Sequence, residues 1–167
     1  MRSRYPSTQR GGHILITEVS IRQNSRHQLP PTLFALQYLY GIESVRESVL
    51  DHLSTRLIRG RNTHGRKGLS LWEILVLGVV RLSEDRDYDS LCDLANEHYT
   101  LRGILGVLPS DGKMGDVVYK VSTIKDTVGQ LDEATLMEIN TLVVKAGHEL
   151  IGKKKGNGSR FAPRFTS

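Results

Sequence analysis

The sequence predicts an all-α fold, a small multi-helix bundle with a helix-turn-helix-like unit at its centre. Apolar residues recur at helical spacing along most of the chain, most densely over residues 71–82. Helix start signals precede several of these runs; Ser70 followed by Glu73 matches a capping box. Hydrophobic residues make up 38% of the 167 residues, which is modest but sufficient for one helical core.

The chain is expected to form one domain with unstructured ends. Residues 1–13 are rich in Arg, Ser, Pro and Gly and have little to bury, so they are expected to be disordered. Residues 14–152 are expected to form the helical domain. Residues 153–167 begin with three lysines followed by Gly, Asn and Ser, and we expect a disordered basic tail.

The first part of the domain combines an extended segment with two helices. Residues 14–21 are β-branched and partly alternating, which predicts a short strand or an extended arm. Pro30 and Pro31 open a helix that Gly41 ends. A second helix begins at Ser44, where Ser44 and Glu47 have capping-box spacing, and its apolar stripe consists of Val45, Val49, Leu53 and Leu57.

Three helices with short links form the predicted central unit. The first starts at Ser70 and is apolar nearly all round, with one buried face made of Leu71, Ile74, Leu75 and Leu82. Asp87 or Asp89 caps the second helix, whose face consists of Leu91, Leu94, Ala95 and His98. Thr100 caps the third. The arrangement is that of a helix-turn-helix, but many bundles without DNA-binding function share it.

Two further helices complete the domain. A loop covers residues 107–116, and Ser122 or Thr123 caps the helix that follows it. Asp132 caps a last helix, expected to be the longest, which ends at Gly152.

The amino-acid sequence of the central unit is more specific than its pattern of helices and short links. Residues 68–107, GLSLWEILVLGVVRLSEDRDYDSLCDLANEHYTLRGILGV, resemble the N-terminal region of bacterial insertion-sequence transposases of the DDE type. Residues 24–40, NSRHQLPPTLFALQYLY, resemble the opening segment of that family, and residues 119–151 resemble the segment leading into its catalytic domain. The resemblance covers residues 14–152. It implies a helical domain that binds the terminal inverted repeats of the element, or assembles the transposase, ahead of an RNase H-like core.

The charge distribution agrees with contact to DNA phosphates. The net charge is +5, and the basic residues concentrate in three segments: residues 1–30, 56–67 and the stretch after Glu149. Residues 84–97 are acidic instead. Basic loops can also be plain solvated linkers. With the resemblance, the predicted phosphate contacts are Arg59, Arg61, Arg66, Lys67, Lys153, Lys154 and Lys155. Arg102, which starts the third central helix, is either a base-edge contact or a surface charge.

No catalytic site is predicted in this chain. The resemblance implies two Asp and one Glu that hold Mg²⁺ on an RNase H-like sheet, with the first Asp shortly after residues 147–155. Residues 156–167 contain no acidic residue, so we expect the sequence to stop before the catalytic core and the chain not to cleave DNA alone. The acids at residues 85–93 are expected to cap helices, and Cys92 and His98 lack a second pair of zinc ligands.

The remaining sequence features limit the possible cellular location and binding partners of the protein. The longest apolar run, residues 74–80, is too short to span a membrane, and no signal peptide is recognisable at the N-terminus. The single cysteine fits a reducing cytoplasm. Expected partners are DNA, a second copy of the chain and a full-length transposase. The alternatives are a dimerisation module that does not bind DNA and a relic of a truncated gene without present function.

Overall fold

The described part of the structure is all-helical, which confirms the predicted fold class. The structure is a computed structural model, and it describes residues 2–6, 12–22, 24–57, 68–139 and 141–142. No strand occurs among these residues, and the one β contact is an isolated bridge between His13 and Pro109. The elements are η2 (Ile16–Glu18), α1 (Leu29–Gly41), α2 (Glu43–Leu57), α3 (Leu71–Glu84), α4 (Tyr88–Glu97), α5 (Tyr99–Leu105) and α6 (Val121–Val128), followed by helical residues 133–139 and 141–142.

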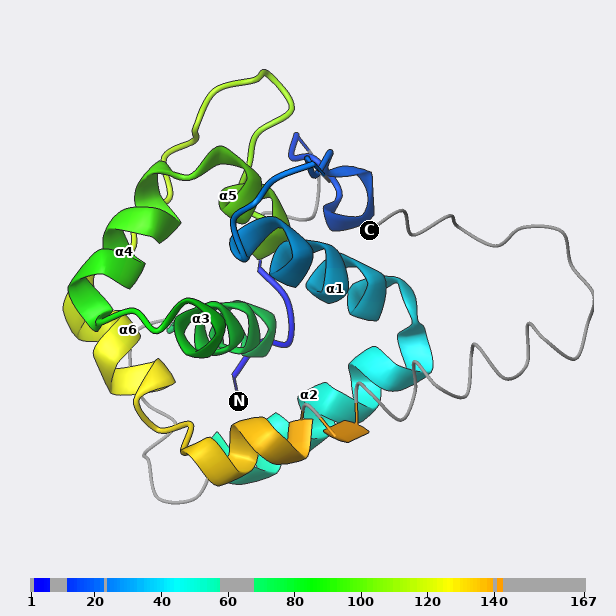
Figure 1. The fold of residues 1–167 in the computed structure, drawn as a ribbon, viewed down its shortest axis with the longest axis vertical. Helices are drawn as coiled ribbons and strands as arrows, with labels where there is room; N and C mark the ends of the chain where they lie inside the picture. The colour runs from blue at the N-terminus through cyan, green and yellow to red at the C-terminus, as the bar shows by residue number, and fades with distance from the viewer. Residues whose placement is uncertain (1, 7–11, 23, 58–67, 140, 143–167) are drawn as a thin grey trace, which may run out of the picture.

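Helix α3 is the centre of the bundle, as its apolar sequence predicts. It packs against α1, α2, α4, α5 and α6, and Figure 1 shows it end-on with α4 and α6 on one side and α1 on the other. The predicted capping box is confirmed: Ser70 Oγ accepts from the Glu73 amide at 3.3 Å, and Glu73 Oε2 accepts from the Ser70 amide at 2.8 Å. Because these bonds satisfy polar groups at the helix start, α3 can begin inside the core.

Trp72 connects three helices at the start of α3. Its side chain is fully buried, and its indole Nε1 donates to the carbonyl oxygen of Ile104 in α5 at 2.8 Å. The ring of Tyr40 in α1 packs edge-on against it, with 4.8 Å between ring centroids. The buried indole therefore has its one donor satisfied while it fills the space between α1, α3 and α5.

One residue of the predicted α3 face is not buried. Leu82 is 52% exposed, although Leu71, Ile74 and Leu75 are buried as expected. The reason is the position of the chain that crosses α3 at Gly78, where a Cβ would lie 2.8 Å from the Leu131 side chain. Leu82 lies one turn beyond this crossing, and no described residue covers it fully.

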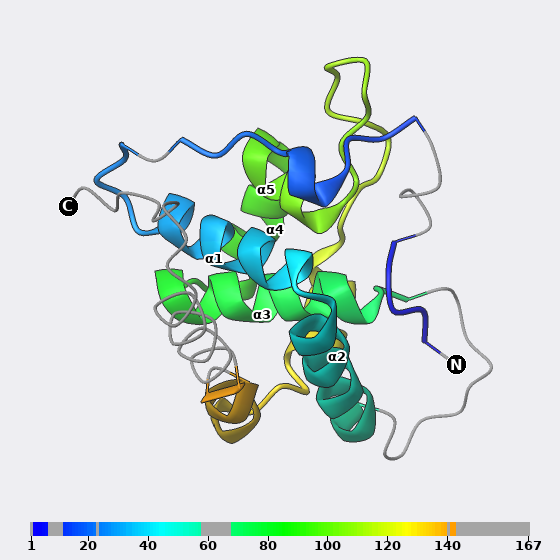
Figure 2. The same ribbon diagram turned by 90° about the vertical axis from the view of Figure 1, so that its right-hand side faces the viewer.

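The N-terminal segment contradicts the expectation of disorder, at least for residues 2–6. The carbonyl oxygens of Ser3 and Arg4 accept from the amides of Leu71 and Trp72 at 2.9 and 3.0 Å. Two amides at the start of α3 are thus satisfied by backbone from a segment that is distant in sequence. Figure 2 shows this segment beside the beginning of α3. The cause lies outside its own composition, because the helix supplies the donors.

The strand predicted for residues 14–21 is also wrong. Ile16–Glu18 form a single 3-10 turn, with Leu15 and Val19 extended on either side. The side-chain amide of Gln37 in α1 donates to the carbonyl oxygens of Ile16 and Val19 at 2.9 and 2.8 Å. The segment therefore pairs with a side chain of α1 instead of a neighbouring strand. Its extended parts fit the alternative expectation of an extended arm.

Several predicted helix caps differ from those observed. Helix α2 begins at Glu43, so Ser44 lies inside the helix, and the Glu47 carboxylate instead accepts from Arg4 Nη1 at 2.8 Å and from the Tyr5 hydroxyl. Helix α5 is capped by His98, not Thr100: His98 Nδ1 accepts from the Leu101 amide at 3.1 Å. In each case the expected residue was a good cap by type, but another residue occupies the position.

The remaining caps divide between correct and incorrect predictions. Asp87 Oδ1 accepts from the Ser90 amide at 2.8 Å, and Asp132 Oδ1 accepts from the Thr135 amide at 2.7 Å, as expected. Helix α6 begins at Val121 after Lys120 with no side-chain cap, so neither Ser122 nor Thr123 has that role. The predicted extension of the last helix to Gly152 lies outside the described residues.

Candidate nucleic-acid interface

Most of the predicted phosphate contacts lie outside the described residues. These are Arg59, Arg61, Arg66 and Lys67 between α2 and α3, and Lys153, Lys154 and Lys155 near the C-terminus. The interface must therefore be sought among the cations that the structure does describe.

Arg102 is a structural residue inside the domain, which corrects both surface roles predicted for it. Its exposed fraction is 1%. Its guanidinium donates to three carbonyl oxygens, those of Met114 at 2.9 Å, Ala95 at 3.1 Å and Val117 at 2.8 Å. These bonds attach the loop before α6 to the α4–α5 corner. In this fold the side chain has no free donor directed at a base edge, so Arg102 is not a base-reading residue.

Helix α5 lacks the exposed face that a recognition helix needs. All five residues from Leu101 to Leu105 are buried. Tyr99 is the exposed large side chain of the helix, and it precedes this buried run. A recognition helix presents several side chains to the major groove. The expected helix-turn-helix function of the central unit is therefore not confirmed by the geometry of α5.

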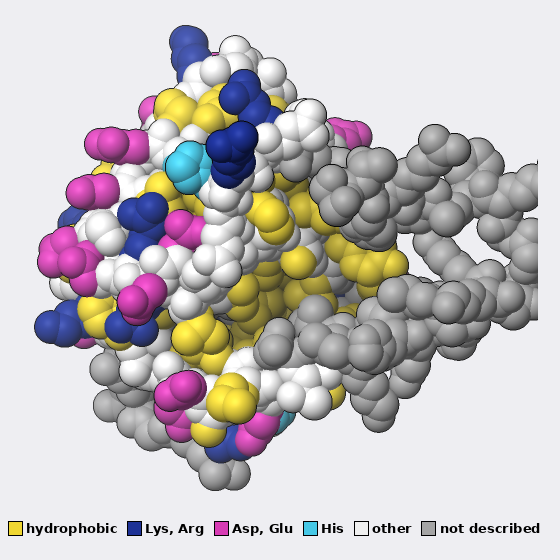
Figure 3. Space-filling view, viewed as in Figure 1, with side chains coloured by type: hydrophobic (Ala, Val, Ile, Leu, Met, Phe, Trp, Pro, Cys, Tyr) yellow, Lys and Arg dark blue, Asp and Glu magenta, His cyan; other side chains and the backbone are white. Residues whose placement is uncertain are grey.

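Helix α4 presents an acidic surface. Asp85, Asp87, Asp89, Asp93 and Glu97 are all exposed on it or on the turn before it. Figure 3 shows acidic side chains gathered over this part of the molecule. Two hydrogen bonds from Ser90, one from its backbone and one from its side chain, lower the pKa of Asp87. The carboxyl therefore stays charged as an N-cap. Carboxylates at this density repel the DNA backbone, so α4 is a poor surface for phosphate contact.

Several of the described arginines are already paired within the molecule. Arg4 forms ion pairs with Glu47 at 2.8 Å and with Asp51. Arg46 donates to the Tyr40 carbonyl oxygen at 2.7 Å. Arg56 pairs with Glu138 at 3.1 Å. Because these guanidinium groups are engaged by neighbouring oxygens, they have fewer donors to offer an external phosphate.

Arg22 and Arg26 are exposed and unpaired. They lie in the segment before α1, and neither forms an ion pair or hydrogen bond with the described part of the chain. His27 is exposed beside them. The stretch from Val19 to Ile42 contains no acidic residue, and the nearest acid in sequence is Glu18, four positions before Arg22. They are the strongest described candidates for phosphate contact.

The sequence had placed these two arginines only within a broad basic segment. The signal that favours Arg26 is the absence of acids on either side of it, which distinguishes it from the exposed lysines and from Arg22, which lies four residues after Glu18. Lys113, Lys120 and Lys125 each have an acid within four residues, at Asp111, Asp116 and Asp126. The start of α1 adds little, because Pro30 and Pro31 have no amide hydrogen to donate. The arginine side chains are therefore the main donors that this segment offers to an anion.

Neither a metal site nor a membrane-spanning helix is found in the part of the chain that the structure describes. No three His, Cys, Asp or Glu side chains there come together as a metal site. Cys92 is buried, and its Sγ donates to the Tyr119 carbonyl oxygen at 3.2 Å; burial is the main cause that raises the pKa of this thiol. No described helix combines the length and the apolar character that crossing a bilayer requires.

Comparison with known proteins identifies no relative: no protein-family model, no curated protein and no solved structure matches this chain. The candidate site therefore depends on its own geometry, namely two unpaired arginines in an acid-free segment and an acidic helix elsewhere on the domain.

Proposed function

We propose that this chain is the DNA-binding and assembly part of an insertion-sequence transposase of the DDE type. Its ligand would be the terminal inverted repeats of the element, and it would act in the cytoplasm. The support is the resemblance of three separate segments, residues 24–40, 68–107 and 119–151, to the N-terminal region of that family. The all-helical structure is the fold class that this resemblance implies.

The observation that carries DNA binding is the pair of exposed, unpaired guanidinium groups of Arg22 and Arg26. Arg26 lies in the segment that resembles the opening of the family, and Arg22 just precedes it. Guanidinium groups suit phosphate oxygens because they offer several donors in a fixed plane. The cations of residues 59–67 and 153–155 would add to this charge.

The mode of contact we propose is backbone binding by basic segments, not base reading by α5. The Arg102 guanidinium donates its hydrogen bonds to carbonyl oxygens inside the domain, and α4 carries exposed carboxylates. Contacts to phosphates fix the register of a protein on DNA without reading its sequence. Discrimination of the inverted repeats would then depend on DNA shape or on segments other than α4 and α5.

A salt titration tests the proposal. Binding of the full chain is measured to the inverted-repeat duplex that flanks its coding sequence and to a shuffled duplex of equal length. Release of counterions makes the logarithm of affinity fall linearly with the logarithm of salt, by about 0.9 for each phosphate contacted. Replacing Arg22 and Arg26 by Ala should reduce this slope by about one unit each. Lys125→Ala on α6 is the matched control and should leave the slope unchanged.

Two outcomes would overturn the proposal. An affinity that is independent of salt would show that phosphates are not the ligand. Equal and weak binding to both duplexes, unchanged in the double arginine variant, would leave only a weakly basic surface, and the function of a dimerisation module without DNA would take its place.

A further inference from the structure

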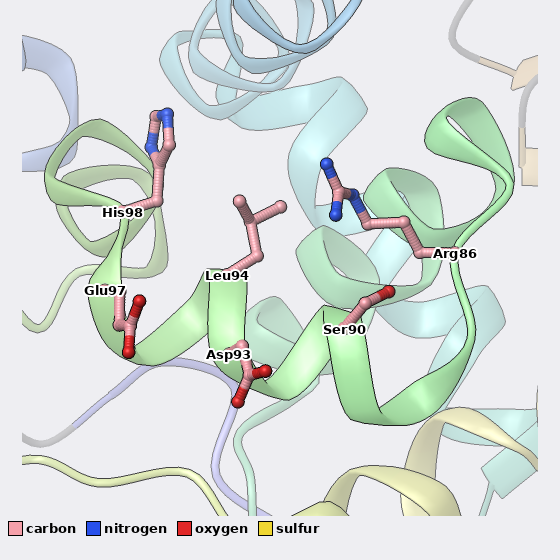
Figure 4. A pocket seen from close by; sticks show the side chains of 6 residues that line it. All are labelled: Arg86, Ser90, Asp93, Leu94, Glu97 and His98. Carbon is pink, nitrogen blue, oxygen red and sulfur yellow. The ribbon is translucent and has the colours of Figure 1, made fainter.

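One side of α4 forms an open pocket of about 380 Å³ that none of the roles above uses. Figure 4 shows the side chains that line it, all from α4 and its two flanking turns: Arg86, Ser90, Asp93, Leu94, Glu97 and His98. Ser90, Asp93, Leu94 and Glu97 follow the spacing i, i+3, i+4 and i+7, which places them along one face of the helix. This is the spacing with which one helix packs along another.

The charges on this face are separated along its length. Arg86 precedes the first turn of α4, whereas Asp93 and Glu97 lie in its second half. Arg86 Nη2 forms an ion pair of 3.7 Å with Glu84 Oε2, which is too long for a hydrogen bond, and Arg86 Nε is buried without a hydrogen-bond partner. Asp93 and Glu97 are exposed and form no ion pair with the described residues. The face thus has a cation with donors left over at one end and two carboxylates without an ion-pair partner at the other.

The middle of the face has one small and one apolar side chain. Ser90 and Leu94 are half-buried, and the Leu94 side chain projects between Arg86 and His98 in Figure 4. At the rim, His98 Nδ1 accepts from the Leu101 amide, so the neutral imidazole carries its hydrogen on Nε2 and can donate from that atom. An isolated anion would meet Arg86 here but also two carboxylates, and DNA would be repelled by them.

We propose that a second copy of this chain binds this face through antiparallel pairing of the two α4 helices. A two-fold axis near the midpoint of the face, at the level of Leu91 and Cys92, sets Arg86 of each copy against Glu97 of the other. The same operation sets Ser90 against Asp93, so each hydroxyl can donate to a carboxylate. A closed symmetric dimer needs a surface that is complementary to itself, and the order of charges along α4 meets this condition.

The position of the leucine supports the same pairing. In this register Leu94 of each copy lies opposite Asp89 of the other and next to its Ser90, where a small side chain leaves room for it. A pair of helices as short as α4 is at the small end of protein interfaces, so a weak dimer is expected whose affinity falls with salt. The inference goes beyond DNA binding, and its test contains no DNA, so each can fail without the other.

Sedimentation equilibrium over a concentration series, at low salt and with the full chain, tests the dimer. Arg86→Glu and Glu97→Arg each place like charges against one another and should weaken association at least tenfold. An equimolar mixture of the two variants should recover a dimer near wild-type affinity, because both cross-subunit pairs of the mixed dimer then join opposite charges. A folding defect in either variant could not produce this recovery.

Matched controls on α6 keep the test specific. Lys125→Glu and Asp126→Arg make the same charge changes on exposed residues of another helix and should leave association unchanged. A wild-type chain that stays monomeric throughout the series would overturn the proposal. A dimer insensitive to both α4 variants, or one lost in both and not recovered on mixing, would do the same. Loss of DNA affinity in Arg86→Glu without any change in association would assign the face to DNA instead.

Discussion

The hydroxyl of Tyr119 donates to Glu73 Oε1 at 2.9 Å, across 46 positions of sequence, and both side chains are buried. The other oxygen of Glu73 accepts from the amide and the hydroxyl of Ser70 at 2.8 and 2.7 Å. Burial and the neighbouring carboxylate both raise the pKa of Tyr119, so its proton stays in place over any ordinary pH range. One carboxylate therefore joins the start of α3 to the segment before α6.

Tyr119→Phe should destabilise the fold because it leaves one buried carboxylate oxygen without a donor. The expected loss is about 1–3 kcal/mol in the free energy of unfolding, measured by urea denaturation. Tyr99→Phe is the matched control, since Tyr99 is exposed on α5, and should change stability little. Equal effects of the two substitutions would mean that the hydrogen bond contributes no more than an exposed hydroxyl.

Arg102→Met should damage stability while leaving DNA affinity intact in the molecules that remain folded. The substitution leaves three carbonyl oxygens, those of Ala95, Met114 and Val117, without their donor. The expected loss in the free energy of unfolding is about 3 kcal/mol or more. Urea denaturation gives the stability, and fluorescence anisotropy at a temperature where the variant is folded gives the affinity. A variant that is as stable as the wild type but has a relaxed sequence preference on DNA would contradict this expectation. It would show that Arg102 reads bases despite its burial.

Acid should weaken the α4–α5 junction through His98. Burial, with a smaller contribution from Arg86, lowers the pKa of His98 in the folded state below its usual value near 6.5. The unfolded chain then binds the proton more readily, so stability is fully present above the unfolded pKa and falls as pH decreases through the folded one. Urea denaturation between pH 7.5 and pH 5 should show this loss. His98→Asn, which can still accept from the Leu101 amide, should show less of it.

Gly78→Ala should destabilise the domain although alanine is the better helix former. The added Cβ would lie 2.8 Å from Leu131 Cδ1 and 3.5 Å from Leu136 Cδ2, so the buried Leu131 side chain must shift. Crowding of this kind costs about 1–3 kcal/mol, which exceeds the gain of about 1 kcal/mol from helix propensity. Gly41→Ala, with no atom within 4 Å of its Cβ, is the control. Thermal unfolding of both variants makes the comparison.

The sequence predicted the helices better than the contacts between them. Helical periodicity and the Ser70–Glu73 spacing are local signals, and both α3 and its capping box were found where they were expected. The expected disorder of residues 2–6 was wrong because the groups that order them, the amides of Leu71 and Trp72, are distant in sequence. Leu82 is exposed for a similar reason, since its coverage depends on where residues 131–136 cross α3.

The candidate site shows the same division between local and long-range information. Composition located the basic segments, because charge is read directly from the residues. It could not separate Arg102 from Arg26, since only the fold determines that one guanidinium meets three carbonyl oxygens while the other meets none. The pairing face of α4 was likewise not predicted from the sequence. The acids at residues 85–93 were expected to cap helices, and only the fold shows that Arg86, Leu94 and Glu97 line one pocket.

The contact of Ser3 and Arg4 with the first amides of α3 has a consequence for biosynthesis. The ribosome releases these two residues long before their binding partners, which emerge only after Trp72 has been added. The nascent segment must therefore remain unattached while α1 and α2 are made, and its docking is a late step that closes a loop of nearly seventy residues. A bulky tag fused just before this segment would hinder that step, whereas a tag at the opposite terminus would leave it undisturbed.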